Sequence, residues 1–240
     1  MQNRYTGDIG DFGKLGLLRA LQHSGLSIGV NWYLVPDENH NDDGRYVQYL
    51  GDESFRSCDE ELWSVLRRIV SLREREVAAL QNAHLLDAVF YPVLFSFAGK
   101  SRPERTAIRK EWHRQALETL SDVDIVFVDP DNGLLVPSAA GTRKENKFVT
   151  LGELSDYYRQ GSSVVYYQHK ARVPDSAYVD AHRKLILSHD FNGASGFGLK
   201  FNKTSLRYYF FILQPDHKAI VDNAVAQMLE TAWGSMFSRV

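Results

Sequence analysis

The sequence predicts an α/β fold in which helices cover both faces of a mostly parallel sheet. Two runs, 125–128 and 163–167, consist almost entirely of apolar and aromatic residues. Such runs are typical of strands that are buried on both faces of a parallel sheet. A helix-like stretch at 151–159 separates them. Strand, helix and strand in this order form a βαβ unit, whose crossover is right-handed in nearly all proteins.

The other elements follow from the same patterns. β-branched and aromatic runs predict strands, and apolar residues at helical spacing predict helices. Strands are expected at 28–35, 124–128, 163–167, 193–201 and 206–213, with 89–97 as either strand or loop. Helices are expected between the loop at 4–14 and Gly25, and at 59–82, 103–120, 151–159, 175–189 and 217–232. We expect one Rossmann-like domain, 1–240, with an antiparallel strand near the C-terminus and a helical insertion at about 55–120.

Composition excludes several classes of protein. Of the 240 residues, 44% are hydrophobic and 12% aromatic, so the chain can form a core and is not intrinsically disordered. Its apolar runs are far shorter than the ~20 residues that cross a membrane, and Met1–Tyr5 does not resemble a signal peptide. Cys58 is the one cysteine, which excludes an internal disulfide. We expect a cytoplasmic protein without a membrane partner, and the net charge of −2 gives no whole-chain argument for nucleic acid.

Polar residues follow three of the expected strands. Asp37 and Glu38 follow the first strand, Asp129–Gly133 follows the central strand, and Gln168–Lys170 follows the next. In open α/β sheets, ligands bind at the carboxyl ends of the strands. The sequence therefore predicts that these three loops meet at one edge of the sheet and form a site.

Asp129, Pro130, Asp131 and Asn132 form the sharpest of these motifs. Their residue types also suit a turn between a strand and a helix, with no further role. The functional interpretation is a fixed pair of carboxylates with an amide at a strand end. Such a group could accept hydrogen bonds from a substrate amine, or hold a hard cation through oxygen ligands.

A second motif runs from Tyr5 to Lys14, where Gly7, Gly10 and Gly13 alternate with acidic residues before a helix. Backbone amides at a helix start favour anions. The spacing does not match a nucleotide-triphosphate P-loop, and a flexible loop with capping residues is the simpler alternative. Two histidines, His169 and His113, could be functional or merely structural, and Arg67–Arg75 is best interpreted as a solvated helix face rather than a nucleic-acid patch.

The run Asp-Ile-Val-Phe-Val-Asp-Pro-Asp-Asn at 124–132 resembles the strand and Asp-Pro-Pro-Tyr motif of adenine methyltransferases that act on the exocyclic amine. Among such enzymes, the chain resembles at a distance the bacterial family that methylates adenine in large-subunit ribosomal RNA. That family carries Gly-Asn-His-Ala-Asp-Val-Leu-Lys-His near its N-terminus, and this chain matches it at Gly7, Asp11 and Lys14. Gly44-Arg45-Tyr46 corresponds to its Gly-Arg-Tyr. The set of motifs also resembles a bacterial protein family that has Asp-Pro-Asp-Asn-Gly and no assigned activity.

The resemblance implies a methyltransferase-type sheet, S-adenosylmethionine as cofactor, and RNA or DNA as the partner. The implied cofactor-binding residues are Tyr5, Gly7, Asp11, Lys14, Asp37 and Glu38. The implied catalytic residues are Asp129, Pro130, Asp131, Asn132, Lys14 and His169. In the motif, Asp131 and Asn132 replace the second proline and the aromatic residue that would stack on a base, and the loop 36–43 has no glycine.

Two other functions remain open from the residues. One is a hydrolase or nuclease that uses magnesium or manganese, with Asp129, Asp131 and His169 as ligands and Lys170 near the phosphate. The other is a binding protein that kept the fold without the catalysis. Cofactor binding without a metal would favour the methyltransferase, and stabilisation by a metal alone would favour the hydrolase.

Overall fold

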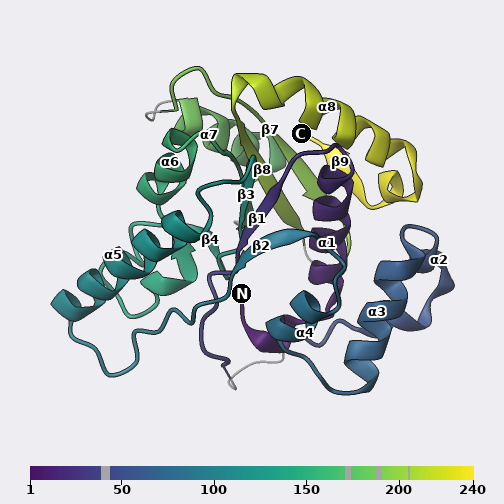
Figure 1. Cartoon of the computed structure of the whole chain (residues 1–240), viewed down its shortest axis with the longest axis horizontal. Helices are drawn as coiled ribbons and strands as arrows, with labels where there is room; N and C mark the ends of the chain where they lie inside the picture. Colours follow the sequence, from purple (N-terminus) through teal and green to yellow (C-terminus); the bar gives the residue numbers. More distant parts are fainter. Residues whose placement is uncertain (39–43, 171–173, 188–190, 205) are drawn as a thin grey trace.

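A computed structural model describes residues 1–38, 44–170, 174–187, 191–204 and 206–240. A seven-stranded sheet lies at its centre, in the order β2-β1-β3-β6-β8-β7-β9 (Figure 1). The strands are β1 (Ile28–Asn31), β2 (Ala88–Tyr91), β3 (Ile125–Val128), β6 (Ser163–His169), β7 (Ser195–Phe201), β8 (Arg207–Leu213) and β9 (Phe237–Arg239). β2, β1, β3 and β6 are parallel, whereas β8 is antiparallel to both of its neighbours and β9 is antiparallel to β7. The predicted mostly parallel α/β sheet is confirmed, and its C-terminal part is antiparallel as expected.

Helices lie on both faces of this sheet (Figure 1). One face carries α1 (Ile9–Gln22), α3 (Glu60–Ser71), α4 (Val77–Asn82) and α8 (Pro215–Glu230). The other carries α5 (Arg102–Thr119), α6 (Leu151–Arg159) and α7 (Asp175–Leu187). The short elements are η1 (Asn3–Tyr5), η2 (Gln48–Gly51), α2 (Glu53–Arg56), β4 (Gly133–Leu134), η3 (Glu145–Lys147), β5 (Phe148–Val149) and η4 (Ala232–Ser235). None of the helices that the structure describes is both long and apolar enough to cross a membrane.

The core is divided between the two faces of the sheet. In β3, Ile125 and Phe127 belong to the hydrophobic cluster beneath α1 and α8, while Val126 and Val128 belong to the cluster beneath α5 and α6. All four side chains are inaccessible to solvent. The alternation of a strand sends successive side chains to opposite faces, so a strand covered on both faces must be apolar throughout. This is why the run 125–128 could be predicted as a central strand.

Glycines on α1 allow the helix to lie close to its neighbours. A Cβ at Gly10 would lie 2.8 Å from Nε of Arg207, one at Gly13 would lie 2.8 Å from the Phe201 ring, and one at Gly16 would lie 2.3 Å from the Trp233 ring. Gly10 and Gly13 therefore lie inside the helix and provide close packing. The alternating glycines of the second motif are explained by packing at these two positions.

We expect Gly16→Ala to lower the free energy of unfolding, although alanine is the better helix former by ~1 kcal/mol. The added carbon would overlap the buried Trp233 ring, and overpacking of this kind costs about 1–3 kcal/mol. Gly152→Ala is the control, because in α6 the nearest atom to the new carbon is Thr150 Oγ1 at 3.8 Å. Urea denaturation should find Gly152→Ala as stable as the wild type or more so, and a stabilised Gly16→Ala would contradict the packing argument.

The segment 59–82, expected as one helix, is two helices, α3 and α4. α3 ends in a turn where Arg73 has φ 59° and the amide of Glu74 donates to the carbonyl of Ile69 at 3.0 Å. A left-handed residue ends a helix, and it is usually glycine. The expected strand 28–35 also ends early, at Asn31, because Tyr33 has φ 43° and its amide donates to Asn31 Oδ1 at 3.0 Å.

Several expected boundaries differ in smaller ways. β2 covers 88–91, so it overlaps only the first three residues of the run 89–97. It pairs with β1 within the central sheet. The range of about 55–120 therefore contains a strand of the main sheet as well as helices. Residues 188 and 189 of the expected helix 175–189, and residues 39–43 of the polar loop, lie outside the described residues. β4, β5 and β9 were not expected.

Candidate functional site

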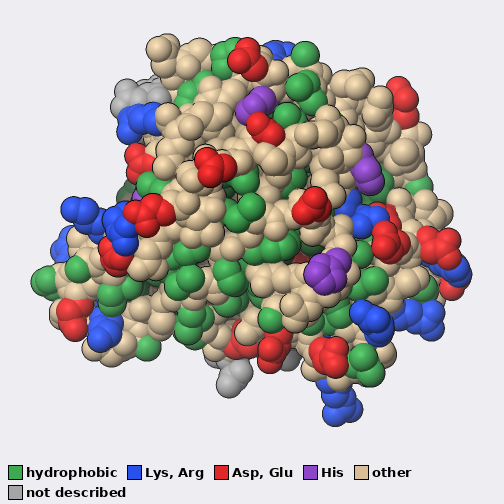
Figure 2. All heavy atoms as spheres, viewed as in Figure 1, with side chains coloured by type: hydrophobic (Ala, Val, Ile, Leu, Met, Phe, Trp, Pro, Cys, Tyr) green, Lys and Arg blue, Asp and Glu red, His purple; other side chains and the backbone are tan. Residues whose placement is uncertain are grey.

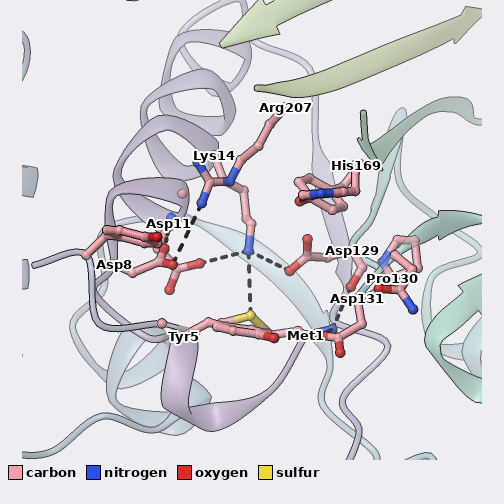
Figure 3. Close-up of a pocket in the computed structure, with 15 residues that line it drawn as sticks. Met1, Tyr5, Asp8, Asp11, Lys14, Asp129, Pro130, Asp131, His169 and Arg207 are labelled. Carbon is pink, nitrogen blue, oxygen red and sulfur yellow. Dashed lines mark hydrogen bonds and ion pairs between the residues drawn. The ribbon is translucent and has the colours of Figure 1, made fainter. Parts of the chain in front are cut away.

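A cavity of about 270 Å³ opens at the carboxyl edge of the sheet (Figure 3). It is lined by Met1, Tyr5, Asp8, Gly10, Asp11, Lys14, Gly44, Tyr46, Asp129, Pro130, Asp131, Asn132, Tyr167, His169 and Arg207. These residues come from the N-terminal segment, the start of α1, the loop between β1 and η2, the loop after β3, the end of β6 and the start of β8. The chain passes from β1 to β2 on one side and then to β3 on the other, so the strand order reverses between β1 and β3. The cavity thus adjoins the crevice where open α/β sheets bind ligands.

Lys14 is at the centre of the site. Its Nζ lies 2.8 Å from Asp11 Oδ1 and 2.6 Å from Asp129 Oδ2, and all three side chains are buried (Figure 3). Burial raises the pKa of both Asp11 and Asp129, and Lys14 only partly opposes this. Burial alone would lower the pKa of Lys14, but its two carboxylates outweigh that effect and raise it. The ammonium therefore stays charged, and two buried carboxylates share it.

The start of α1 fixes Asp11 and Lys14 in place. Asp8 caps the helix, since its Oδ1 accepts from the amide of Asp11 at 3.0 Å. Gly7 has φ 77°, a conformation that favours glycine, and its amide donates to Asp11 Oδ2 at 3.1 Å. Asp11 and Lys14 are three residues apart and so lie on the same face of the helix. The loop with capping residues, the simpler interpretation of this motif, accounts for these contacts.

Asp131 lies beside this cluster, and its side chain is only 3% exposed. Its Oδ2 accepts from Gln2 Nε2 at 2.6 Å and lies 3.3 Å from Lys147 Nζ. Burial alone would raise the pKa of Asp131, but the amino group of Met1 and Lys147 lower it. Oδ1 of Asp131 has no hydrogen-bond partner, and its ion-pair neighbour, the nitrogen of Met1, is 3.6 Å away.

Residues 1–5 fill the crevice between the ends of β1 and β3. The nitrogen of Met1 donates to the carbonyl oxygens of Tyr33 and Asp129 at 3.2 and 2.9 Å. The amide of Val35 donates to the carbonyl of Met1 at 2.9 Å. Gln2 is fully buried, and Met1 is 3% exposed. The chain itself therefore occupies the place where a ligand would lie at this crevice.

Two residues predicted to bind a cofactor, Asp37 and Glu38, form hydrogen bonds with this N-terminal segment. The amide of Arg4 donates to Asp37 Oδ1 at 3.2 Å, and Arg4 Nη1 donates to the carbonyl of Glu38 at 2.5 Å. Lys147 Nζ lies 2.5 Å from Glu38 Oε2. Asp37 and Glu38 are therefore bound within the chain and do not line the cavity, and neither does Gly7.

The other predicted site residues meet in the cavity. Tyr5, Asp11, Lys14, Asp129, Pro130, Asp131, Asn132 and His169 all line it. Met1, Asp8, Tyr46, Tyr167 and Arg207 line it too and were not predicted as site residues. Asp8 had a signal, as the capping residue before a helix, and Tyr46 belongs to the Gly-Arg-Tyr match. Arg207 had none, because its place at this edge depends on β8 running antiparallel to β6.

Three residues outside the two main motifs, His113, Lys170 and Arg75, form contacts with other parts of the chain. His113 Nε2 lies 3.0 Å from Asp156 Oδ2, and its ring packs edge-on against Tyr157, so it joins α5 to α6. Lys170 is paired with Asp175. Arg75, in the turn after α3, donates to the carbonyls of Thr6 and Gly44 at 2.8 and 2.5 Å and so braces the loops beside the cavity.

Acidic side chains of the site lie next to basic side chains of the protein. Within the described part of the chain, no group of three or more His, Cys, Asp or Glu side chains is placed to hold a metal. Asp129 and Asp131 each face a cation of the protein instead. Figure 2 shows Lys and Arg mixed with Asp and Glu over the visible face, rather than gathered in a basic patch.

The chain matches no protein-family model, and no curated protein is similar to it in sequence. What the fold and the cavity define is a class: a Rossmann-like α/β protein with a polar cavity at the carboxyl edge of its sheet.

Proposed function

We propose that the protein is an S-adenosylmethionine-dependent methyltransferase that acts on an amine, such as the exocyclic amine of a nucleic-acid base. One observation supports this above the others. The two motifs of the resemblance are more than 100 residues apart in the sequence, and they meet in one cavity, where Lys14 Nζ lies 2.6 Å from Asp129 Oδ2.

The chemistry of the cavity suits the methionyl end of this cofactor. The Arg207 guanidinium can pair with a carboxylate. Asp8 and the unpartnered Oδ1 of Asp131 can accept from an ammonium or a hydroxyl group. At about 270 Å³ the cavity is just below the ~300–1,000 Å³ of most small-molecule sites, so it would hold one end of the cofactor.

When bound, the cofactor supplies an electrophilic methyl group, which an amine nitrogen takes up as the carbon–sulfur bond breaks and the amine loses a proton. The chain would position that amine. Asp129 and the carbonyl of Pro130 can accept its N–H bonds and so aim the lone pair, and positioning of this kind supplies much of the rate. Burial raises the pKa of Asp129, which makes this carboxylate a better proton acceptor than an exposed aspartate.

Thermal unfolding with S-adenosylmethionine or S-adenosylhomocysteine tests the proposal. Ligand at 100 times its dissociation constant should stabilise the protein by about 2.7 kcal/mol. Tyr46→Ala should reduce the shift without unfolding the protein, because Tyr46 lines the cavity and is 38% exposed. Leu72→Ala is the control, since Leu72 is 56% exposed and lies outside the cavity lining.

A shift for the wild type that is reduced in Tyr46→Ala and kept in Leu72→Ala supports the proposal. Transfer of a labelled methyl group to adenine-containing single-stranded RNA or DNA would then identify the acceptor. If neither adenosyl compound raises the melting temperature, the cofactor assignment is wrong. If magnesium or manganese alone raises it, the hydrolase becomes the better hypothesis.

A further inference from the structure

The side chain of Met1 belongs to the hydrophobic cluster on the α1 face, but its sulfur lies at the edge of the buried charged cluster of Lys14. Lys14 uses two of its donors on carboxylates, and its contact with Met1 is the thioether sulfur at 3.7 Å, a weak acceptor. Oδ1 of Asp131 is buried, lies 3.6 Å from the nitrogen of Met1 and has no hydrogen bond. Buried polar groups are almost always paired, so a polar ligand group here would give Asp131 the hydrogen bond that it lacks and Lys14 a stronger acceptor than sulfur.

Apart from the buried side chain of Met1, the contacts that hold residues 1–4 are hydrogen bonds that a ligand or water could replace. Gln2 joins both walls of the crevice, because its Nε2 donates to Asp131 Oδ2 at 2.6 Å and its Oε1 accepts from the amide of Glu38 at 3.0 Å. The amide of Arg4 donates to Asp37 at 3.2 Å. Bonds of this kind exchange for bonds to water or to a ligand at a small net cost.

We propose that residues 1–4 form a displaceable plug, and that the place of the Met1 side chain is a ligand subsite. This subsite takes a polar group that accepts a hydrogen bond from Lys14 and donates one to Asp131, as an amino acid or a ribose diol can. Only the identity of the ligand rests on the proposed function. Because Met1 lines the cavity, its departure joins the cavity to the crevice between β1 and β3 and makes room for a whole cofactor.

A ligand can bind only to the molecules in which the plug is displaced. Its apparent affinity is therefore lowered by the fraction of molecules in that state. Gln2→Ala removes the three side-chain hydrogen bonds of Gln2, to Asp131, Glu38 and Tyr5, so we expect it to bind S-adenosylmethionine about five-fold more tightly than the wild type in titration calorimetry. Gln22→Ala is the matched control. At the far end of α1, Gln22 also accepts one backbone hydrogen bond, from Asp87 at 3.0 Å, and this variant should bind like the wild type.

Hydrogen exchange tests the plug without any ligand. The amides of Val35 and Glu38 donate to Met1 and Gln2, so they should exchange through local opening, on the order of 100-fold faster than the amide of Phe127 in β3. Gln2→Ala should widen this difference, and Gln22→Ala should leave it unchanged.

The outcomes separate the two proposals. Equal or weaker cofactor binding by Gln2→Ala overturns the plug while the proposed function stands. If neither the wild type nor the variants bind the cofactor, the proposed function fails and hydrogen exchange decides the plug. If the amides of Val35 and Glu38 exchange only through global unfolding, the plug proposal is overturned. If they exchange faster, through local opening, it is supported.

Discussion

Lys14→Met is expected to lower the free energy of unfolding by about 3–5 kcal/mol at neutral pH. Methionine has a similar length but no charge, so Asp11 and Asp129 would remain buried without their shared cation. The cost of such a change comes mainly from the uncompensated charges rather than from the lost ion pair itself. Urea denaturation of the two proteins at equal pH measures the difference.

The loss should depend on pH. Burial already raises the pKa of Asp11 and Asp129, and without Lys14 both would rise further. A carboxyl with a raised pKa in the folded state costs stability as pH rises from its unfolded value, ~3.9, through the folded one. The deficit of Lys14→Met should therefore be smaller at pH 5 than at pH 7.5.

Lys218→Met is the control for this experiment. Lys218 also forms an ion pair, 2.6 Å from Asp222, but its side chain is 53% exposed. Exposed pairs contribute about 0–1 kcal/mol. If Lys14→Met costs no more than Lys218→Met, then the buried cluster does not stabilise the fold, and its geometry would have to be explained by function alone.

The sheet could be predicted because its pattern is local. β3 and the first part of β6 are apolar on both faces, and the helix between them is marked by the cap at Thr150. Because β3 and β6 are predicted to be parallel neighbours, the loops that follow them must lie at the same edge of the sheet. The same reasoning placed Asp129–Asn132 and His169 in one site.

The features that could not be predicted depend on long-range contacts. Nothing in Met1–Tyr5 marks a segment that lies between two strands, since the nitrogen of Met1 is held there by the carbonyls of Tyr33 and Asp129, which are more than 30 positions away. Arg73 is a good helix former and gives no sign of the left-handed turn that separates α3 from α4. Methyl transfer, the cofactor and a nucleic-acid partner remain proposals, because they came from the resemblance.

Arg109→Met should have an effect of similar size, about 3–5 kcal/mol, on the other side of the sheet. Arg109 is paired through Nε and Nη2 with both carboxylate oxygens of Glu153, at 2.7 and 2.5 Å. Nη1 and Nη2 also donate to the carbonyls of Glu145 and Phe148. The substitution would leave a buried carboxylate and two carbonyl oxygens without this donor. Arg114→Met is the matched control, because Arg114 lies on the same helix and pairs with Glu111 and Glu118 but is 52% exposed.

The substitution Arg109→Met should also loosen a loop of the cavity, and the stability that it costs should be smaller at low pH. The segment that Arg109 holds includes Lys147, whose carbonyl accepts from the amide of Asn132 at 3.0 Å, so its loosening should free the loop that carries Asp131. Burial alone would raise the pKa of Glu153, but Arg109 lowers it, so the wild type gains stability above the unfolded value of ~4.3 and loses it as pH falls through the folded one. Without Arg109, Glu153 takes up a proton at higher pH and the deficit shrinks. A deficit that is constant between pH 7 and pH 5 would mean that packing, and not the charge on Glu153, is what the arginine provides.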